Sequence, residues 1–411
     1  MRAPNPAQHP KAGLVMAGGG ARAAYQVGVL SAVAELVPPG APSPFQIVCG
    51  TSAGAINAVA IASDATHFRR GVRRLTGVWE NFHAHHVYRS DVTGIGACGA
   101  RWLAAILLGG LGHNNPVSLL DNAPLRSLLE RELDLSGLQR SIDQGALTAL
   151  SVTASGYTSG ESISFFKGHP SIPGWRRARR IGVAVEIAVS HLMASAAMPF
   201  LFPPVRIHRE YFGDGSMRQI APISPALHLG AERVMVISVA NADRGRERMQ
   251  TEHCPSLAQV AGHALNSIFL DALEADIERL TRINRTTSLI PPELRDSGPA
   301  ALKHIDCIVL SPSQDIERIA LEHLHTLPRP VRFFLSGIGA MRRSGSNLAS
   351  YLLFERSFCR ALLRLGYEDT MARRDEVLSF LAAEGGRCAV GSGTSTRAEA
   401  APAIESAAHM V

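Results

Sequence analysis

The 411-residue chain has few cysteines, no long apolar run and no recognisable spacing of metal ligands. Its six cysteines are scattered without paired or C-x-x-C spacing, so we expect free thiols in a reducing compartment. The longest candidate membrane element, residues 102–111, is shorter than the about 20 apolar residues that span a bilayer. Residues 1–11 are polar and contain proline, unlike a signal peptide. We therefore expect a cytoplasmic protein, neither a disulfide scaffold nor a membrane-spanning one.

Basic residues outnumber acidic ones, and the excess is spread along the chain. The formal net charge is +6, yet no nucleic-acid recognition motif accompanies it, so we expect no nucleic-acid partner. One local cluster comprises Arg176, Arg177, Arg179 and Arg180 beside Trp175. Such a cluster could hold an anionic membrane surface, or it could be a solvated arginine-rich turn or helix. For residues 102–111, a mobile lipid-binding lid and a buried core helix likewise both stay open.

A serine between two glycines is the most informative local motif. Residues 50–54 read Gly-Thr-Ser-Ala-Gly and join an apolar run, residues 45–49, to an Ala-rich segment. This order predicts a buried strand, a sharp turn and a helix, which is the context of a nucleophile elbow. Gly50 and Gly54 would let strand and helix approach closely. Ser52 would lie at the helix N-terminus, where free N–H groups favour developing negative charge.

A second glycine cluster lies one strand and one helix earlier. Gly18, Gly19 and Gly20 follow a predicted strand at residues 14–17 and precede a predicted helix at residues 24–36. Successive glycine N–H groups can hold an oxyanion or a phosphate. The segment also satisfies the dinucleotide pattern G-x-G-x-x-G/A, but that interpretation requires an acidic residue at the end of the next strand. The sequence has Cys-Gly there instead, which favours an oxyanion loop.

No histidine lies in a local motif that would make it the base of a catalytic triad. Three histidines have ordinary strand-edge or surface contexts: His191, His208 and His228. Asp214 is the better candidate, because Gly213 and Gly215 flank it in a turn after an apolar strand. An Asp-Gly pair alone is usually a solvated turn, so Asp214 is a candidate base only in combination with the other motifs.

Taken together, four segments resemble the patatin-like phospholipase family. They are Gly18–Arg22 followed by Gly28–Leu30, the serine motif at 50–54, the block Ala194–Pro204 and the aspartate turn Gly213–Gly215. They occur in the family's order and span roughly residues 12 to 240. Two positions depart from the family pattern. Ala23 stands where the family usually has glycine, and Ser216 where it usually has glycine or alanine.

The resemblance implies an α/β fold, namely a three-layer patatin-like sandwich. Helices would flank a mostly parallel central sheet, and a helical C-terminal extension would follow. Ser52 would be the nucleophile and Asp214 the base of a dyad without histidine. The oxyanion hole would be formed by the loop Gly18, Gly19, Gly20, Ala21 and Arg22. Arg22 could neutralise charge near this loop or point to solvent at the start of a helix.

The function that the resemblance implies is a serine lipid acyl hydrolase, an esterase of phospholipase A or lysophospholipase type, working through an acyl-enzyme. We expect a lipid ester substrate, peripheral contact with a membrane surface, and no cofactor or metal. The sequence does not indicate the oligomeric state. Two alternatives stay open: a catalytically silent lipid-binding protein and a dinucleotide-binding oxidoreductase.

The chain divides into four predicted parts. They are a flexible arm at 1–11, a catalytic core at 12–240, a remaining core strand and helical region at 241–383, and a disordered tail at 384–411. In the third part, residue spacing predicts one long helix over 256–284, a core strand over 305–310 and an amphipathic helical stretch over 346–365.

Overall fold

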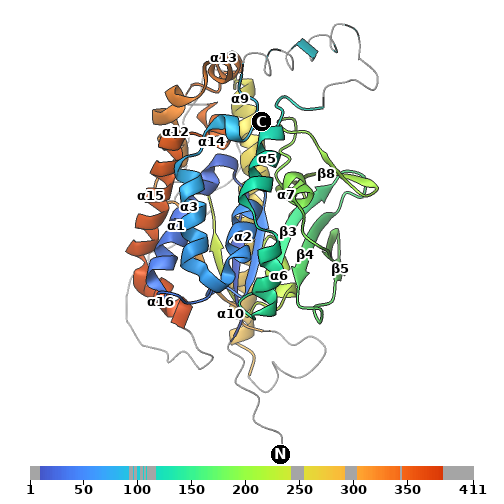
Figure 1. Cartoon of the computed structure of the whole chain (residues 1–411), viewed down its shortest axis with the longest axis vertical. Coiled ribbons are helices and arrows are strands. Elements are labelled where there is room, and N and C mark those ends of the chain that lie inside the picture. The colour runs from blue at the N-terminus through green and yellow to red at the C-terminus, as the bar shows by residue number, and fades with distance from the viewer. Residues whose placement is uncertain are drawn as a thin grey trace, which may run out of the picture.

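The computed structural model describes residues 10–91, 117–241, 254–291, 303–342 and 345–382, together with residues 96, 100, 101, 105 and 108. A central sheet is covered by helices on both faces, so the described chain forms three layers (Figure 1). The predicted α/β sandwich with a mostly parallel sheet and a helical C-terminal region is confirmed. The predictions for residues 1–9, for residues 384–411 and for most of 102–111 fall outside the described residues.

One sheet of ten strands forms the middle layer of the described chain. The strands are β1 (Ala12–Met16), β2 (Ile47–Thr51), β3 (Ala149–Gly156), β4 (Ser162–Gly168), β5 (Trp175–Arg177), β6 (Arg180–Ala184), β7 (Val205–Ile207), β8 (Glu210–Asp214), β9 (Arg233–Ile237) and β10 (Asp306–Leu310). Their main order is β10-β9-β1-β2-β3-β4-β6-β5, and the hairpin β7–β8 joins through a pairing of β8 with β3. Strands β10, β9, β1, β2 and β3 are mutually parallel, whereas β4 and β8 run antiparallel to β3.

Side chains of the parallel strands alternate between two cores, because successive residues of a strand point to opposite faces. In β1, Met16 packs into the larger core and Val15 into the smaller core. In β9, Met235 belongs to the larger core and Val236 to the smaller one. Both faces of these strands are therefore buried, which explains why β9 is almost continuously apolar after Arg233.

Helices form the two outer layers. The α-helices are α1 (Ala24–Leu36), α2 (Ala53–Ser63), α3 (Phe68–Glu80), α5 (Ala123–Glu132), α6 (Ser136–Asp143), α7 (Val189–Ser195), α8 (Ser224–His228), α9 (Leu257–Asn266), α10 (Ala272–Ser288), α12 (Ile316–His323), α13 (Arg329–Gly337), α14 (Ser346–Leu352), α15 (Arg356–Ala372) and α16 (Arg374–Ala382). Helices α1, α2, α3, α5 and α15 cover one face of the sheet, and α8 and α10 cover the other (Figure 1). The helix predicted over 24–36 is confirmed as α1.

Helix α15, near the end of the described chain, packs along α1 through two glycines. A Cβ atom on Gly28 would lie 2.0 Å from the carbonyl oxygen of Leu363, and one on Gly366 would lie 2.2 Å from that of Tyr25. A larger residue at either position would push the two helices apart. The helical C-terminal region is thereby fixed against the first helix of the fold.

Two stretches predicted as continuous helices are interrupted. The stretch at 256–284 consists of α9, a π-helical segment at Ser267–Asp271, and α10. In a π-helical turn the backbone hydrogen bonds join residues five positions apart instead of four. The spacing of apolar residues in the sequence does not reveal this change. The stretch at 346–365 consists of α14 and α15, and extended backbone at Glu355 separates them. The core strand predicted at 305–310 is confirmed as β10.

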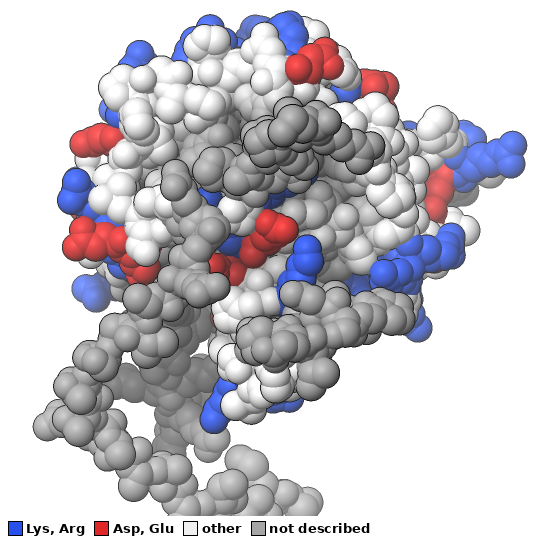
Figure 2. Space-filling view, turned by 90° about the horizontal axis from the view of Figure 1, so that it is seen from below, with Lys and Arg blue, Asp and Glu red and all other residues white. Residues whose placement is uncertain are grey.

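The arginine cluster lies on the β5–β6 hairpin at the edge of the sheet. Arg176 and Arg177 are exposed in β5, and Arg179 occupies the turn with φ of 57°. The cluster is therefore an exposed hairpin and not a helix, and this exposure fits a solvated turn and a contact with an anionic membrane surface equally. On the face shown in Figure 2, the coloured Lys and Arg side chains are interspersed with Asp and Glu.

In the described ranges, every helix is too short or too polar to cross a bilayer.

Candidate active site

Ser52 lies in the sharp turn between β2 and α2, at the carboxyl end of a central strand. Its backbone has φ of 56° and ψ of −131°, a conformation that residues other than glycine seldom adopt. The turn is tight because a Cβ atom on Gly50 would lie 2.4 Å from the carbonyl oxygen of Gly54. A Cβ atom on Gly54 would lie 2.5 Å from the carbonyl oxygen of Ala17. The predicted strand–turn–helix context is confirmed, and only glycine fits on either side of the turn.

Asp214 approaches Ser52 through the pairing of three strands. Strand β3 pairs with both β2 and β8, and the register sets Thr51 opposite Thr153 and Ala154 opposite Asp214. The last residue of β8 therefore lies beside the end of β2. Ser52 Oγ donates a hydrogen bond of 2.6 Å to Asp214 Oδ2. Two residues 162 positions apart in the sequence are thus in direct contact.

The Asp214 carboxyl group is fully buried. Burial raises its pKa to about 6, although hydrogen bonds from Ser52 and Ser216 lower it. The backbone N–H of Ser216 donates a bond of 3.0 Å to Oδ1, and the Ser216 hydroxyl also stabilises the carboxylate. Ser216, one of the two departures from the family pattern, therefore holds one carboxylate oxygen while Ser52 bonds to the other.

The glycine loop adjoins the serine turn, because β1 and β2 are neighbouring parallel strands. After the loop, the 3₁₀ segment η1 (Gly20–Ala23) begins, and the backbone N–H of Arg22 donates to the Gly19 carbonyl at 3.1 Å. The N–H groups of Gly20 and Ala21 precede that bond, so the segment itself gives them no acceptor. Gly20 has φ of +54°, and a Cβ atom there would lie 2.4 Å from the Tyr351 carbonyl oxygen. This backbone path requires glycine.

The other glycines of the motifs also lie at close contacts. A Cβ atom on Gly18 would lie 2.5 Å from Ser216 Oγ, so the glycine loop and the aspartate turn touch. A Cβ atom on Gly215 would lie 2.1 Å from the Thr153 carbonyl oxygen, and one on Gly213 would lie 2.5 Å from a tyrosine hydroxyl. The three turns that form the site therefore pack directly against one another.

Arg22 is buried, so the interpretation as a solvent-pointing arginine is wrong. Its side chain turns toward α14, where Nε donates to Ser350 Oγ at 2.8 Å and Nη2 donates to Asn347 Oδ1 at 2.9 Å. The guanidinium lies over the Tyr351 ring, 4.1 Å from its centroid. The glycine loop is in this way tied to a helix that lies 328 residues further along the chain.

Sequence reasoning alone gives Ser195 no role, yet Ser195 supports the serine turn. Its buried Oγ accepts a hydrogen bond of 2.9 Å from the Ser52 backbone N–H and donates one of 2.6 Å to the Thr153 carbonyl. The turn is thereby fixed to β3. The only signal in the sequence is a single hydroxyl in the otherwise apolar block Ala194–Pro204.

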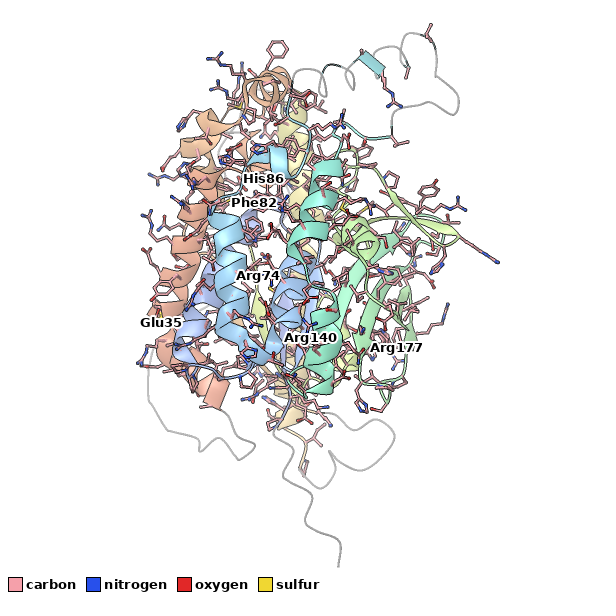
Figure 3. The ribbon with its side chains drawn as sticks, viewed as in Figure 1. Glu35, Arg74, Phe82, His86, Arg140 and Arg177 are labelled. Atoms are coloured by element: carbon pink, nitrogen blue, oxygen red, sulfur yellow. The ribbon has the colours of Figure 1, made fainter. Side chains whose placement is uncertain are left out.

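An apolar cavity opens at Ser52 and runs between α2, α3 and α5. It contains about 830 Å³ of space not occupied by atoms, part of it open to solvent. Apart from Ser52, Arg74 and Glu132, the described residues that line it are apolar or glycine. Phe354, which follows α14, forms part of the wall together with Phe82. Figure 3 labels Arg74, which belongs to α3, and Phe82, which lies just beyond the C-terminal end of that helix.

The three histidines noted in the sequence have structural contacts of their own. His191 is buried in α7, where Nδ1 accepts a bond of 2.9 Å from the Ala188 N–H, so the surface interpretation is wrong for this residue. His208 occupies the turn of the β7–β8 hairpin, and His228 stacks on Trp175. Across the described ranges, no group of three His, Cys, Asp or Glu residues could hold a metal ion.

Fold and site together define a three-layer α/β protein with an elbow serine bonded to a buried aspartate. The family model for patatin-like phospholipase matches residues 14–227. The chain therefore belongs to the patatin-like phospholipase family. The matched range includes the glycine loop, Ser52 and Asp214, and it ends before α14 and α15.

Two solved structures with similarity to the chain come from different organisms. VipD from Legionella pneumophila is 16% identical over 90% of this chain and 67% of its own, with a TM-score of 0.34. Human GIVD cytosolic phospholipase A2, in complex with methyl gamma-linolenyl fluorophosphonate, is 14% identical over 93% of this chain, with a TM-score of 0.41. The chain spans 60% of the length of that human protein. No curated protein matches the sequence.

Proposed function

We propose that the protein is a lipid acyl hydrolase that cleaves carboxylic esters with a Ser52–Asp214 dyad. The main support is the hydrogen bond of 2.6 Å between Ser52 Oγ and Asp214 Oδ2 at one end of an apolar cavity. A carboxyl group with a pKa of about 6 accepts a proton more readily than an ordinary aspartate and is still ionised at pH 7. Membership of the patatin-like phospholipase family supports the same class of substrate.

In the first half of the reaction, Ser52 Oγ attacks the carbonyl carbon of the ester, and its proton passes to Asp214 Oδ2. The carbonyl π electrons move onto oxygen, and the backbone N–H groups of Gly19, Gly20 and Ala21 stabilise this oxyanion. As the tetrahedral intermediate collapses, the bond to the alcohol breaks and Asp214 returns the proton to the leaving oxygen. Ser52 then carries the acyl group.

In the second half, water attacks the acyl-enzyme and gives its proton to Asp214. Collapse of this intermediate releases the fatty acid and returns the proton to Ser52. The acyl chain occupies the apolar cavity throughout, because each methylene group taken out of water contributes about 0.8 kcal/mol. No step of this scheme requires a cofactor.

Peripheral contact with a lipid surface fits the apolar side chains beside the cavity. Phe200 is 78% exposed and Val117 is 64% exposed. Their segments adjoin, because the Leu119 N–H donates to the Phe200 carbonyl at 2.8 Å. Phe202, two residues further on, lines the cavity. An acyl chain that leaves a lipid layer at Phe200 would therefore have a short apolar path to Ser52.

Labelling with a fluorophosphonate probe, followed by peptide mass spectrometry, tests this proposal. We expect a single label on Ser52 and, in a parallel assay, release of fatty acid from phospholipid vesicles. Heat-denatured protein serves as the control. Lipid binding without labelling or release would instead indicate the catalytically silent lipid-binding protein. Saturable NAD binding without labelling would indicate the oxidoreductase.

Replacement of Arg22 by methionine is expected to lower kcat about 10- to 100-fold while KM changes little. Methionine keeps an unbranched stem but cannot bond to Ser350 and Asn347, so the glycine loop loses its tie to α14. Loss of one oxyanion donor costs about 10²–10³ in rate, and a displaced donor should cost less. Steady-state kinetics on a soluble ester measure the effect. Arg69→Met, which removes an arginine bonded to the end of α1, is the control, and an unchanged kcat in Arg22→Met would refute the role.

A further inference from the structure

The cavity that begins at Ser52 ends at two charged residues. Helix α2 starts after Ser52 and presents Ile56 and Ala60 to the cavity. The short connection from α2 to α3 turns the chain back, so the start of α3 lies beside the end of α2. Arg74 of α3 and Glu132, the last residue of α5, line the cavity there. From Ser52 to Ala60 the distance along the helix axis is about 12 Å, at 1.5 Å per residue.

Arg74 closes this end by bonds to both neighbouring helices. Its Nη1 lies 3.3 Å from Oδ2 of Asp64, the residue that follows α2, and its Nη2 donates to the Glu132 carbonyl at 2.5 Å. Asp64 is largely buried and also pairs with Arg70 at 2.8 Å. The Arg74 side chain is 46% exposed, so its guanidinium lies where the cavity meets solvent. Figure 3 shows Arg74 on the side of α3 that faces α5.

We propose that Arg74 limits the length of the acyl chain by forming a polar end wall to the acyl site. This inference rests on the proposed hydrolase function. Each buried methylene favours binding, but a chain that reaches the guanidinium must displace it from Asp64 and from the Glu132 carbonyl. The energetic gain from further methylenes therefore stops at Arg74.

The length of the cavity indicates which acyl chains fit. An extended chain of single bonds advances about 1.2 Å per bond, as an extended polypeptide backbone does. The distance of about 12 Å from Ser52 to Ala60 therefore accommodates roughly ten carbons. Esters of unbranched medium-chain fatty acids are the substrate class that fills the site without displacing Arg74.

A series of p-nitrophenyl esters, from butyrate to palmitate, tests the inference. In Arg74→Ala, the ratio of kcat/KM for palmitate to kcat/KM for octanoate should rise at least about tenfold, because the end wall is removed. Arg70→Ala is the matched control, since Arg70 also pairs with Asp64 but is not among the described residues that line the cavity. Its ratio should equal that of the wild type.

A second variant blocks the cavity before the wall. In Ala60→Leu, the added carbons should lower the ratio of kcat/KM for laurate to that for butyrate at least about tenfold. Fluorophosphonate labelling of each variant shows whether Ser52 is reactive. Two outcomes would overturn the role of Arg74 but not the hydrolase function. In the first, Arg74→Ala is labelled at Ser52 but its ratio of kcat/KM for palmitate to that for octanoate equals the wild-type ratio. In the second, Arg70→Ala is labelled and its ratio rises as much as that of Arg74→Ala. Absence of labelling in the wild type would overturn the hydrolase function and the inference with it.

Discussion

Replacement of Ser52 by alanine is expected to lower ester hydrolysis on the order of 10⁶-fold, as loss of the nucleophilic serine does in a serine protease. Without Oγ no acyl-enzyme can form, and only the glycine loop and the cavity remain to act on the substrate. Fatty acid released from phospholipid vesicles, identified by mass spectrometry, measures the loss. Ser43→Ala, which removes a buried hydroxyl bonded to the backbone of Phe45, is the matched control.

Ser52→Gly distinguishes loss of chemistry from loss of fold. Glycine also lacks the hydroxyl group, so Ser52→Gly should be as inactive as Ser52→Ala. Because glycine adopts the φ of 56° without strain, Ser52→Gly should be more stable than Ser52→Ala by about 1 kcal/mol. Denaturant titration measures the difference in the free energy of unfolding. An alanine or glycine variant that keeps more than a small fraction of wild-type turnover would show that Ser52 is not the nucleophile.

The rate of hydrolysis is expected to increase about tenfold per pH unit up to about pH 6 and to level off above it. Asp214 must be ionised to accept the serine proton, and burial raises its pKa to about 6. Below this pH most molecules carry a protonated Asp214, which cannot act as a base. The profile of kcat/KM against pH measures the effect. A profile that is flat between pH 4 and 7 would contradict the proposed base.

In Asp214→Asn, kcat/KM should fall about 10²–10⁴-fold, and the step near pH 6 should disappear. The same variant should be more stable than the wild type at pH 7. The folded protein keeps the Asp214 proton to a higher pH than the unfolded chain does, so stability is lost as the pH rises from 3.8 to about 6. Because asparagine carries no charge, Asp214→Asn avoids this loss. At pH 7 its free energy of unfolding should exceed that of the wild type by up to about 3 kcal/mol, at about 1.4 kcal/mol per pKa unit. Thermal unfolding at pH 4 and pH 7 measures it.

The local parts of the site could be predicted because each lies in a short motif at the end of a strand. The glycine loop follows β1 and the serine turn follows β2, and neighbouring parallel strands bring their carboxyl ends together. The requirement for Gly50 and Gly54 also followed from the sequence, since a sharp strand-to-helix turn leaves no room for side chains. The contact between Ser52 and Asp214 depended on the resemblance, because no local pattern encodes the pairing of β3 with β8.

The supporting residues could not be predicted, because their contacts join distant segments without a periodic pattern. Whether Arg22 is solvated or buried depends on α14, more than 300 residues later, and no neighbouring residue reveals that helix. Ser195 lies in an apolar block, and it supports the serine turn only because its hydroxyl bonds to the backbone of Ser52 and of Thr153. His191 is buried because α7 packs over the sheet, which a single histidine in the sequence does not indicate.

The tie between Arg22 and α14 has a consequence for how the protein is made. A nascent chain that has emerged only as far as Asp214 already contains the serine and its partner, but it has neither Ser350 nor Asn347 to hold the glycine loop. It also lacks Phe354 in the wall of the acyl cavity. The tie to Arg22 and this part of the cavity wall can therefore form only after residue 354 has been made, so the proposed hydrolysis should reach its full rate only in a chain that extends at least that far.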